Sequence, residues 1–288
     1  MITRRALLKR MAWITLLMNS SNDLFSKETK SNIGISACDW SIGKSSDLGA
    51  FDVAKKIGLE GIQVNVGTAT NNLHLREKAL QRQYLKRSKE TGIRISSIAM
   101  AELNNVPYKS DPRTEEWVSD SIDVAKNLGV NVVLLAFFHK NDLRKDDAGK
   151  KEVIARLKKV ASKTERMGIT LGIESYLSAE ELVDIIQKVG SKSIKVYYDF
   201  RNSADAGYDV IKEIKFLGKE AICELHMKEN GFLLGKGTLD WKKIGETLMD
   251  MNYYGDGWMQ IEGAIPEGAD IVQSYKLNLK YLQDIFQR

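Results

Sequence analysis

Residues 170–199 read TLGIESYLSAEELVDIIQKVGSKSIKVYYD, which predicts a strand, a helix and a second strand in that order. The runs Thr170–Glu174 and Lys195–Asp199 are short and mostly apolar, as parallel strands covered by helices usually are. Between them, Ser178 precedes the helical pattern Ala179–Val189 and a glycine follows it, which are the usual start and stop signals of a helix. The stretch therefore predicts one unit of a parallel sheet with its crossover helix.

The same alternation of strand and helix continues in both directions from this stretch. Further strand candidates are Ile33–Ala37, Gly61–Val66, Arg94–Met100, Val132–Phe137, Ala221–His226 and Trp258–Glu262. Further helical patterns cover Thr114–Leu128, Lys151–Met167, Trp241–Met251 and Tyr275–Phe286. Eight such units predict a single α/β domain over residues 33–288, closed into a (β/α)8 TIM barrel. An open, doubly wound sheet is the alternative, but no G-x-G-x-x-G motif follows the first strand.

The composition is that of an ordinary globular domain and gives no sign of a nucleic-acid partner. The 288 residues are 43% hydrophobic and 28% charged, with three prolines and no low-complexity run. Residues 1–26 hold four basic and one acidic side chain, so 4 − 1 = +3 of the net charge of +5 lies there and +2 remains. This remainder is too small for a nucleic-acid footprint. Cys38 and Cys223 lie inside apolar runs, where we expect buried free thiols.

The N-terminus resembles a twin-arginine export signal. Arg4 and Arg5 precede a lysine and the apolar run Met11–Met18, and a polar exit follows over residues 19–22. The apolar run has the length of a signal core and is well short of a membrane span. We expect residues 1–26 to direct a bacterial protein to the periplasm, with no stable membrane insertion after export. A basic helix at the terminus is the alternative.

Four polar residues end four successive apolar runs in the second half of the chain. They are Glu174, Asp199, His226 and Glu262, at separations of 25, 27 and 36 residues, about one strand–helix unit each. Barrel active sites lie at the C-terminal ends of the strands, and adjacent strands are about 4.8 Å apart, so we expect these side chains to converge. Each residue alone has a simpler interpretation as a helix cap, a surface charge or a core histidine. Four in register favour one shared site.

A divalent metal ion explains why three carboxylates would be placed together. Without a cation, they would repel one another and lose solvation. One imidazole with three carboxylates is a hard, oxygen-rich set of ligands, which favours Mn²⁺, Mg²⁺, Co²⁺ or Fe²⁺ and leaves Zn²⁺ as an option. We expect one ion, with Mn²⁺ as the first choice.

Short motifs surround each of these four residues. They are Gly172-Ile173-Glu174, Tyr198-Asp199-Phe200, Leu225-His226-Met227-Lys228 and Gln260-Ile261-Glu262-Gly263, together with the glycine turn Gly235–Trp241. The motifs resemble the sugar phosphate isomerase/epimerase family, which has the xylose isomerase-like barrel and includes ketose 3-epimerases and hydroxypyruvate isomerases. The resemblance covers Ile33 to the C-terminus and does not specify a substrate.

The resemblance implies that Glu174 and Glu262 are metal ligands and also the catalytic acid/base pair, with Asp199 and His226 as ligands only. It implies proton removal next to a carbonyl through an enediolate, in proteins that often form homo-oligomers.

Two regions depart from the ketose epimerases of that family. Those enzymes often have a glutamate on the second strand and a second histidine three residues after the ligand Asp. This chain reads Gln63-Val64-Asn65 in the first region and has Asn202 in the second. Asn202 could still orient a ligand or a substrate hydroxyl. The differences argue against simple ketose epimerisation.

Five other polar or aromatic residues are expected near the predicted rim. Lys228 could reach a substrate oxygen or be a solvated loop lysine. His139 and His74 follow the fourth and second strands and are candidate substrate contacts, with His74 the weaker one. Trp40 follows the first strand and could stack on a sugar face or only line the barrel mouth. Glu102 ends the third strand and could equally be a loop charge.

These features favour an isomerase or epimerase acting on an unphosphorylated keto-sugar, because an exported enzyme seldom meets phosphorylated intermediates. A lyase that cleaves 3-keto-glycosides would share the enolisation step and stays open. A non-catalytic sugar-binding protein is the alternative from another class. Metal-dependent apurinic endonucleases share the barrel, but they need a histidine-rich cluster and this chain has three histidines. The expected partner is a small carbohydrate, not a nucleic acid.

Overall fold

Eight parallel strands close into a barrel in the computed structural model, which describes residues 33–253 and 257–286. Each strand pairs with the next along the chain, and the eighth pairs with the first. The strands are β1 (Gly34–Cys38), β2 (Gly61–Asn65), β3 (Arg94–Met100), β4 (Val132–Phe137), β5 (Thr170–Ser175), β6 (Ile194–Asp199), β7 (Ile222–Lys228) and β8 (Trp258–Glu262). The predicted TIM barrel is confirmed, and the doubly wound alternative is wrong because the β1–β8 pairing leaves no open sheet edge.

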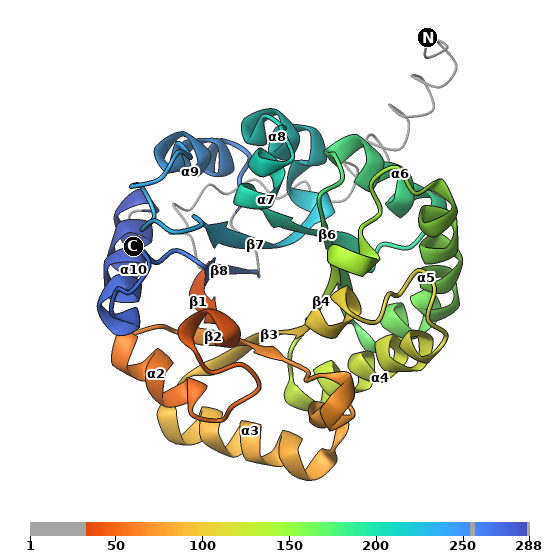
Figure 1. Ribbon diagram of the computed structural model, residues 1–288, viewed down its shortest axis with the longest axis horizontal. Helices are drawn as coiled ribbons and strands as arrows, with labels where there is room; N and C mark the ends of the chain where they lie inside the picture. Colours follow the sequence, from red (N-terminus) through yellow and green to blue (C-terminus); the bar gives the residue numbers. More distant parts are fainter. Residues whose placement is uncertain (1–32, 254–256, 287–288) are drawn as a thin grey trace, which may run out of the picture. The chain divides into compact units, whose positions relative to one another are not determined.

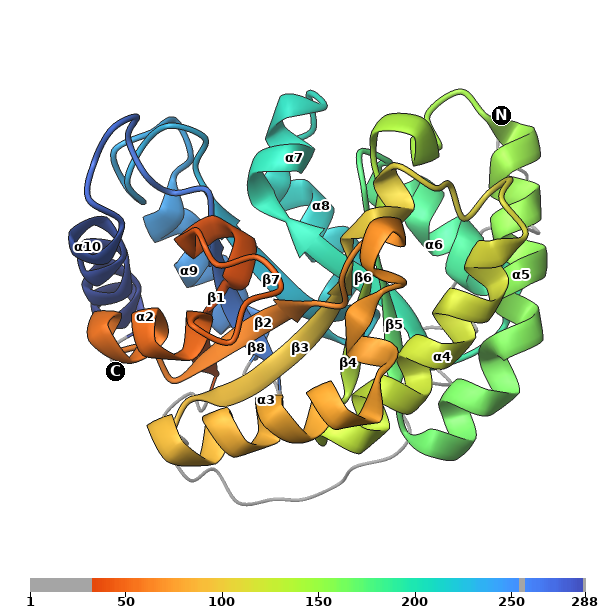
Figure 2. The ribbon, with the colours of Figure 1, turned by 60° about the horizontal axis from the view of Figure 1, so that its bottom comes forward.

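A ring of helices surrounds the strands (Figure 1). The α-helices are α2 (Ala50–Ile57), α3 (Lys78–Thr91), α4 (Arg113–Leu128), α5 (Asp147–Met167), α6 (Ala179–Val189), α7 (Phe200–Asp205), α8 (Val210–Ala221), α9 (Trp241–Asp250) and α10 (Ile271–Ile285). Short 3-10 helices lie in the loops: η1 (Asp39–Ile42), η2 (Ala69–Asn71), η3 (His74–Arg76), η4 (Ala101–Asn104) and η5 (His139–Asn141). Figure 2 shows α7 at the end of the barrel where the strands finish.

Two helices begin four residues before their predicted starts. The side chain of Asp146 accepts a hydrogen bond from the Gly149 backbone at the start of α5, and Asp270 accepts one from Gln273 at the start of α10. These aspartates are N-caps, which satisfy backbone N–H groups of the first turn. The capping residues therefore mark the true starts better than the apolar periodicity does.

The apolar core lies between the strands and the helices, while part of the barrel interior is polar. Its side chains with polar groups include the following, each at most 1% exposed: Ser36, Gln63, Ser97, Tyr197, Glu224 and Gln260. Most TIM barrels fill this space with bulky branched residues. The polar interior lies directly beneath the ends of the strands that carry the predicted site.

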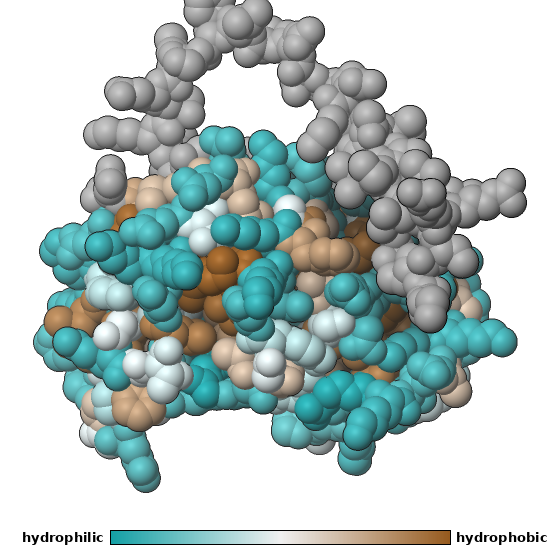
Figure 3. Space-filling model, turned by 90° about the horizontal axis from the view of Figure 1, so that it is seen from above, coloured by the Kyte–Doolittle hydropathy of each residue, from teal (hydrophilic) through white to brown (hydrophobic). Residues whose placement is uncertain are grey.

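The face of the protein drawn in Figure 3 is mostly hydrophilic. Figure 3 looks onto the side of the barrel where α8 lies and shows small apolar areas among polar side chains. Within residues 33–253 and 257–286, no helix has the length and apolar character needed to cross a membrane. Both cysteines are free thiols, as expected. Cys38 is buried as predicted, but Cys223 is partly exposed, so the prediction of burial is wrong for Cys223.

Gly172 in β5 has no space for a side chain. A Cβ atom there would lie 2.6 Å from the Cys223 sulfur and 3.1 Å from Tyr197. We expect Gly172→Ala to destabilise the protein by about 2 kcal/mol, because overpacking a filled interior forces neighbours to move, and to lower Tm by about 5 °C. Thermal unfolding followed by circular dichroism measures this. An unchanged Tm would contradict the close packing described for this strand.

Candidate metal centre

The carboxyl ends of β5 to β8 bring Glu174, Asp199, His226 and Glu262 together. One potential ligand atom of each lies within 4.8 Å of those of the other three. His226 Nδ1 is 2.9 Å from Glu174 Oε1, 3.3 Å from Glu262 Oε2 and 3.9 Å from Asp199 Oδ2. The strand register produces this arrangement, because it pairs Asp199 with His226 across β6 and β7. The predicted convergence of the four side chains is therefore observed.

The cluster has the character of a cation site. Asp199 Oδ2 and Glu262 Oε2 are buried, and within the described residues neither accepts a well-directed hydrogen bond, although the Lys228 ammonium lies within ion-pair distance of both. Burying carboxylate oxygens in this way is costly, and a divalent cation would stabilise both. Three carboxylates and one imidazole are also ligands that hard divalent ions accept. The residues present fit one divalent metal ion.

Lys228 supplies positive charge at the edge of the cluster. Its Nζ lies 3.1 Å from Glu262 Oε2 and 3.5 Å from Asp199 Oδ2. Burial alone would raise the pKa of Glu262, but the Lys228 ammonium and His226 lower it to about 2. Burial dominates at Asp199 and raises its pKa to about 7, with Glu262 and Glu174 adding to the rise and Lys228 opposing it. The two carboxyls thus differ in proton affinity.

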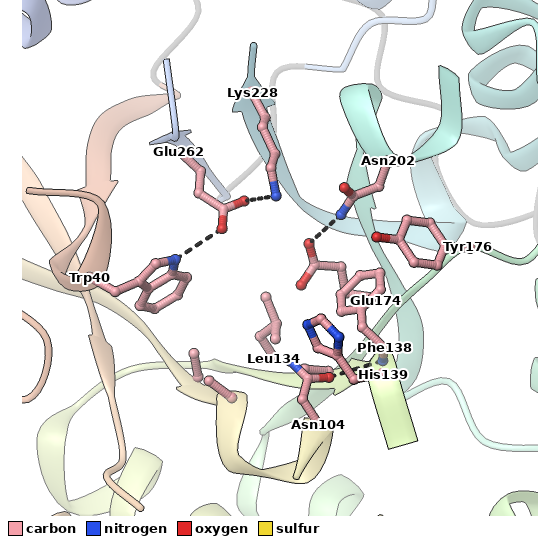
Figure 4. Close-up of a pocket in the computed structure, with 13 residues that line it drawn as sticks. Trp40, Asn104, Leu134, Phe138, His139, Glu174, Tyr176, Asn202, Lys228 and Glu262 are labelled. Carbon is pink, nitrogen blue, oxygen red and sulfur yellow. Dashed lines mark hydrogen bonds and ion pairs between the residues drawn. The ribbon is translucent and has the colours of Figure 1, made fainter. Parts of the chain in front are cut away.

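Two further residues orient the carboxylates (Figure 4). Trp40 in η1 donates from Nε1 to Glu262 Oε1 at 2.9 Å. Asn202 in α7 donates from Nδ2 to Glu174 Oε1 at 3.4 Å, and its backbone N–H donates to Asp199 Oδ1 at 2.8 Å. Both residues were expected near the rim, and both line the cavity beside the cluster. Each of the two residues can therefore hold its carboxylate in one orientation.

A cavity of about 210 Å³ opens beside the cluster. Its polar wall includes Glu174, Glu262 and Lys228, and its other walls include aromatic rings. The rings of Phe138 and Tyr176 meet edge to face with centroids 4.7 Å apart.

His139 also lines this cavity, as expected for a substrate contact. Its backbone has φ +48°, in the left-handed region that non-glycine residues rarely adopt. The arrangement can hold one small polar molecule between carboxylates and aromatic side chains.

Two sequence candidates do not line the cavity. Glu102 accepts hydrogen bonds from the Ala69 backbone at 3.0 Å and from Asn105 Nδ2 at 3.1 Å, so it holds two loops together. His74 packs its ring against Tyr84. Neither residue is among those that surround the cavity.

Sequence reasoning did not identify Tyr176, Phe138 or Asn104. Tyr176 lies two residues after Glu174, and the alternation of a strand places such residues on one face, so this signal was present. Asn104 accepts a hydrogen bond from the Phe138 backbone at 2.9 Å. These two residues lie just beyond β3 and β4, and no strand pattern extends there.

Asp39 is a buried carboxyl at the end of β1. Its Oδ2 accepts from the backbones of Ser46 and Asn65 at 2.9 and 3.0 Å, yet burial raises its pKa from 3.8 to about 7. The folded state thus binds this proton more tightly, so stability falls as pH rises from about 4 to 7, by up to about 4 kcal/mol. Asp39→Asn keeps an acceptor oxygen and should remove this contribution to the dependence of the unfolding free energy on pH. Urea unfolding across this pH range measures it, and equal slopes would contradict it.

Comparisons with known proteins agree with the fold. The family described as "Xylose isomerase-like TIM barrel" matches residues 51–285. The D-psicose 3-epimerase of Enterocloster bolteae is 28% identical over 150 residues, which is 49% of this chain and 48% of that protein. The chain thus matches about half the length of this curated relative.

Solved structures share the fold. D-psicose 3-epimerase from Clostridium cellulolyticum H10 has a TM-score of 0.74 at 17% identity, covering 88% of this chain and 99% of that one. The 3-keto-D-glucoside 4-epimerase from E. coli has a TM-score of 0.72 at 16% identity, covering 88% and 100%. At these identities, the likeness concerns the fold.

Proposed function

We propose that this chain, which belongs to the family of xylose isomerase-like TIM barrels, is a metal-dependent sugar isomerase or epimerase. Its substrate is an unphosphorylated keto-sugar or sugar derivative, and the reaction begins with removal of the proton next to the carbonyl. The convergence of Glu174, Asp199, His226 and Glu262 beside a cavity carries this proposal. The similarity to ketose epimerases and to a 3-keto-glucoside 4-epimerase supports the same class.

Those four side chains are the residues that would hold the metal ion, for which Mn²⁺ is the first choice among hard divalent cations. A divalent ion held there would act as a Lewis acid and would make the proton next to the substrate carbonyl more acidic.

The protein's own groups move the proton. Glu174 and Glu262 enter the cavity from different sides, so one can remove a proton from a face of the substrate and the other can return it (Figure 4). Asn202 orients the Glu174 carboxylate and Trp40 orients the Glu262 carboxylate by hydrogen bonds. The Lys228 ammonium lies beside Glu262 and stabilises negative charge on a substrate oxygen.

Cleavage of 3-keto-glycosides is the second candidate. Removal of the same proton permits the neighbouring glycosidic C–O bond to break, so that the alcohol leaves and an unsaturated sugar remains. The departures from the ketose epimerases keep this candidate open. Residues 63–65 contain no glutamate, and Asn202 stands three residues after Asp199, where those enzymes often have a histidine. The fold is similar both to a ketose epimerase and to a protein acting on a 3-keto-glucoside, so it does not separate the two candidates.

One experiment tests both candidates. The Mn²⁺-loaded protein is incubated in D₂O with a panel of free ketoses and 3-keto-glucosides, and the products are analysed by mass spectrometry. An isomerase or epimerase incorporates solvent deuterium into the sugar, whereas a lyase also releases the alcohol. Absence of deuterium uptake with every substrate would favour a non-catalytic sugar-binding protein.

Export through the twin-arginine route remains our proposal, since residues 1–26 lie outside the described residues. The twin arginines and the apolar run that follows support it. Fusing residues 1–32 to a reporter should carry the folded reporter to the periplasm, and replacing Arg4 and Arg5 together with lysine should reduce export at least about 10-fold. Cell fractionation measures this. Equal export of both fusions would contradict the assignment.

A further inference from the structure

We propose that Glu224, Tyr197 and Gln63 form a directional chain of hydrogen bonds that determines which ring nitrogen His226 presents to the metal centre. The inference rests on the metal centre of the proposed function. The three residues lie in the barrel interior and are at most 1% exposed. They come from three strands, β7, β6 and β2, so the closed barrel brings them together.

The chain is continuous from the ligand to the buried carboxyl. His226 Nε2 lies 3.0 Å from Gln63 Oε1. The amide nitrogen of Gln63 donates to the Tyr197 hydroxyl at 2.9 Å and to Ser97 Oγ at 3.1 Å. The Tyr197 hydroxyl donates to Glu224 Oε2 at 2.8 Å. Each hydrogen-bond distance in the chain is in the normal range.

The direction of the chain follows from its far end. Glu224 Oε2 accepts from Tyr197 and also from the Gln260 amide at 2.8 Å, so it acts as an acceptor in both bonds. The single hydroxyl proton of Tyr197 is therefore directed at Glu224, and the hydroxyl oxygen is left to accept from the Gln63 amide nitrogen. This places the amide oxygen of Gln63 toward His226.

The orientation of the Gln63 amide decides the tautomer of His226. An amide oxygen has no proton to donate, so His226 Nε2 must carry the proton that joins it to Gln63. The other ring nitrogen, Nδ1, is the one that faces Glu174 at 2.9 Å and Glu262 at 3.3 Å. With Nε2 protonated, Nδ1 has a lone pair for a cation. A reversed amide would set N–H groups against Nε2 and favour the wrong tautomer.

A purely structural explanation does not account for a carboxyl group at this position. In the part of the chain that the structure describes, Glu224 Oε2 is satisfied by two neutral donors, the Tyr197 hydroxyl and the Gln260 amide. A glutamine or an apolar side chain would fill the same volume with a smaller desolvation cost. An oxygen that accepts from the Gln260 amide carries no proton of its own, whereas a glutamine at this position could turn a donor toward Tyr197 and leave the direction of the hydrogen bonds unset.

Two variants of the full-length protein test the chain. Tyr197→Phe removes the hydroxyl link, and Glu224→Gln keeps the size of the side chain but adds a donor. Tyr198→Phe is the matched control, because this neighbouring tyrosine on the same strand donates to Ser203 Oγ at 2.9 Å instead. Titration calorimetry with Mn²⁺ measures metal affinity. Nitrogen-15 NMR of the Mg²⁺-loaded protein reports the hydrogen bond of His226 Nε2–H, which is assignable among three histidines.

We expect Tyr197→Phe and Glu224→Gln to weaken Mn²⁺ binding about 10-fold, as loss of a partner behind a metal-bound histidine typically does. The His226 Nε2–H signal should shift in both variants. In Tyr198→Phe, the affinity should change by less than about two-fold and the signal should stay in place. If Tyr197→Phe does not fold, Glu224→Gln still tests the inference, because it alters the same series of hydrogen bonds.

Three outcomes would count against the inference. Unchanged Mn²⁺ affinity in both Tyr197→Phe and Glu224→Gln would show that this series of hydrogen bonds does not act on His226. Equal weakening in Tyr197→Phe and Tyr198→Phe would indicate a general packing effect, and an unshifted Nε2–H signal would exclude coupling to the ring. If the wild-type protein bound no Mn²⁺, the proposed metal centre itself would fail, while the Nε2–H signal of the metal-free protein would still test the chain.

Discussion

Replacing either Glu174 or Glu262 with glutamine should lower kcat for the proton-transfer reaction by about 10²- to 10⁴-fold, the usual contribution of a positioned acid or base. A glutamine has nearly the same size and can still bind a cation through its oxygen, but it cannot accept the substrate's α-proton. Both carboxylates already lie beside the cavity, and each has its own orienting donor, Asn202 or Trp40. The loss should therefore appear in kcat more than in KM.

The measurement is deuterium uptake into the sugar under saturating Mn²⁺, with the metal content of each variant determined in parallel. Glu102→Gln is the matched control, because Glu102 joins two loops and does not line the cavity. Its activity should stay within a few-fold of the wild type. Substantial activity in both Glu174→Gln and Glu262→Gln, with metal bound, would refute the assigned acid/base pair.

The proposed metal centre predicts that a chelator abolishes turnover and lowers Tm by roughly 10 °C. A ligand present at 1,000 times its Kd stabilises the folded state by about 4 kcal/mol, and each kcal/mol corresponds to about 2–4 °C in a chain of this size. The ligand atoms of Glu174, Asp199, His226 and Glu262 lie within 4.8 Å of one another, so losing the cation also restores repulsion between the carboxylates. Adding Mn²⁺ after the chelator should restore both properties.

Asp199→Asn separates stabilisation by the bound cation from repulsion between the carboxylates. The substitution removes one negative charge and its desolvation cost, so the metal-free variant should be at least as stable as the metal-free wild type. It should also lose most of the rise in Tm on adding Mn²⁺, because a ligand is missing. Differential scanning calorimetry with and without EDTA measures both. An identical Tm with EDTA and with Mn²⁺ in the wild-type protein would rule out a bound structural cation.

The predictable parts of this protein are those in which a local pattern has a single physical meaning. Short apolar runs separated by amphipathic helices predicted the barrel, since only parallel strands covered by helices bury such runs on both sides. The strand-end positions of Glu174, Asp199, His226 and Glu262 predicted their convergence, because the ends of parallel strands share one rim. The starts of α5 and α10 were missed where capping by Asp146 and Asp270 outweighs apolar periodicity.

The sequence by itself therefore determined the strand–helix alternation, the closure into eight units and the four side chains at the carboxyl ends of β5 to β8. Only the tertiary structure decided which neighbours these side chains have. Trp40 meets Glu262 from 222 positions away because closure pairs β1 with β8, and Gln63 in β2 meets His226 in β7 from 163 positions away in the barrel interior. Such contacts depend on barrel closure and strand register, whereas sequence periodicity records only which face of its own element a residue occupies.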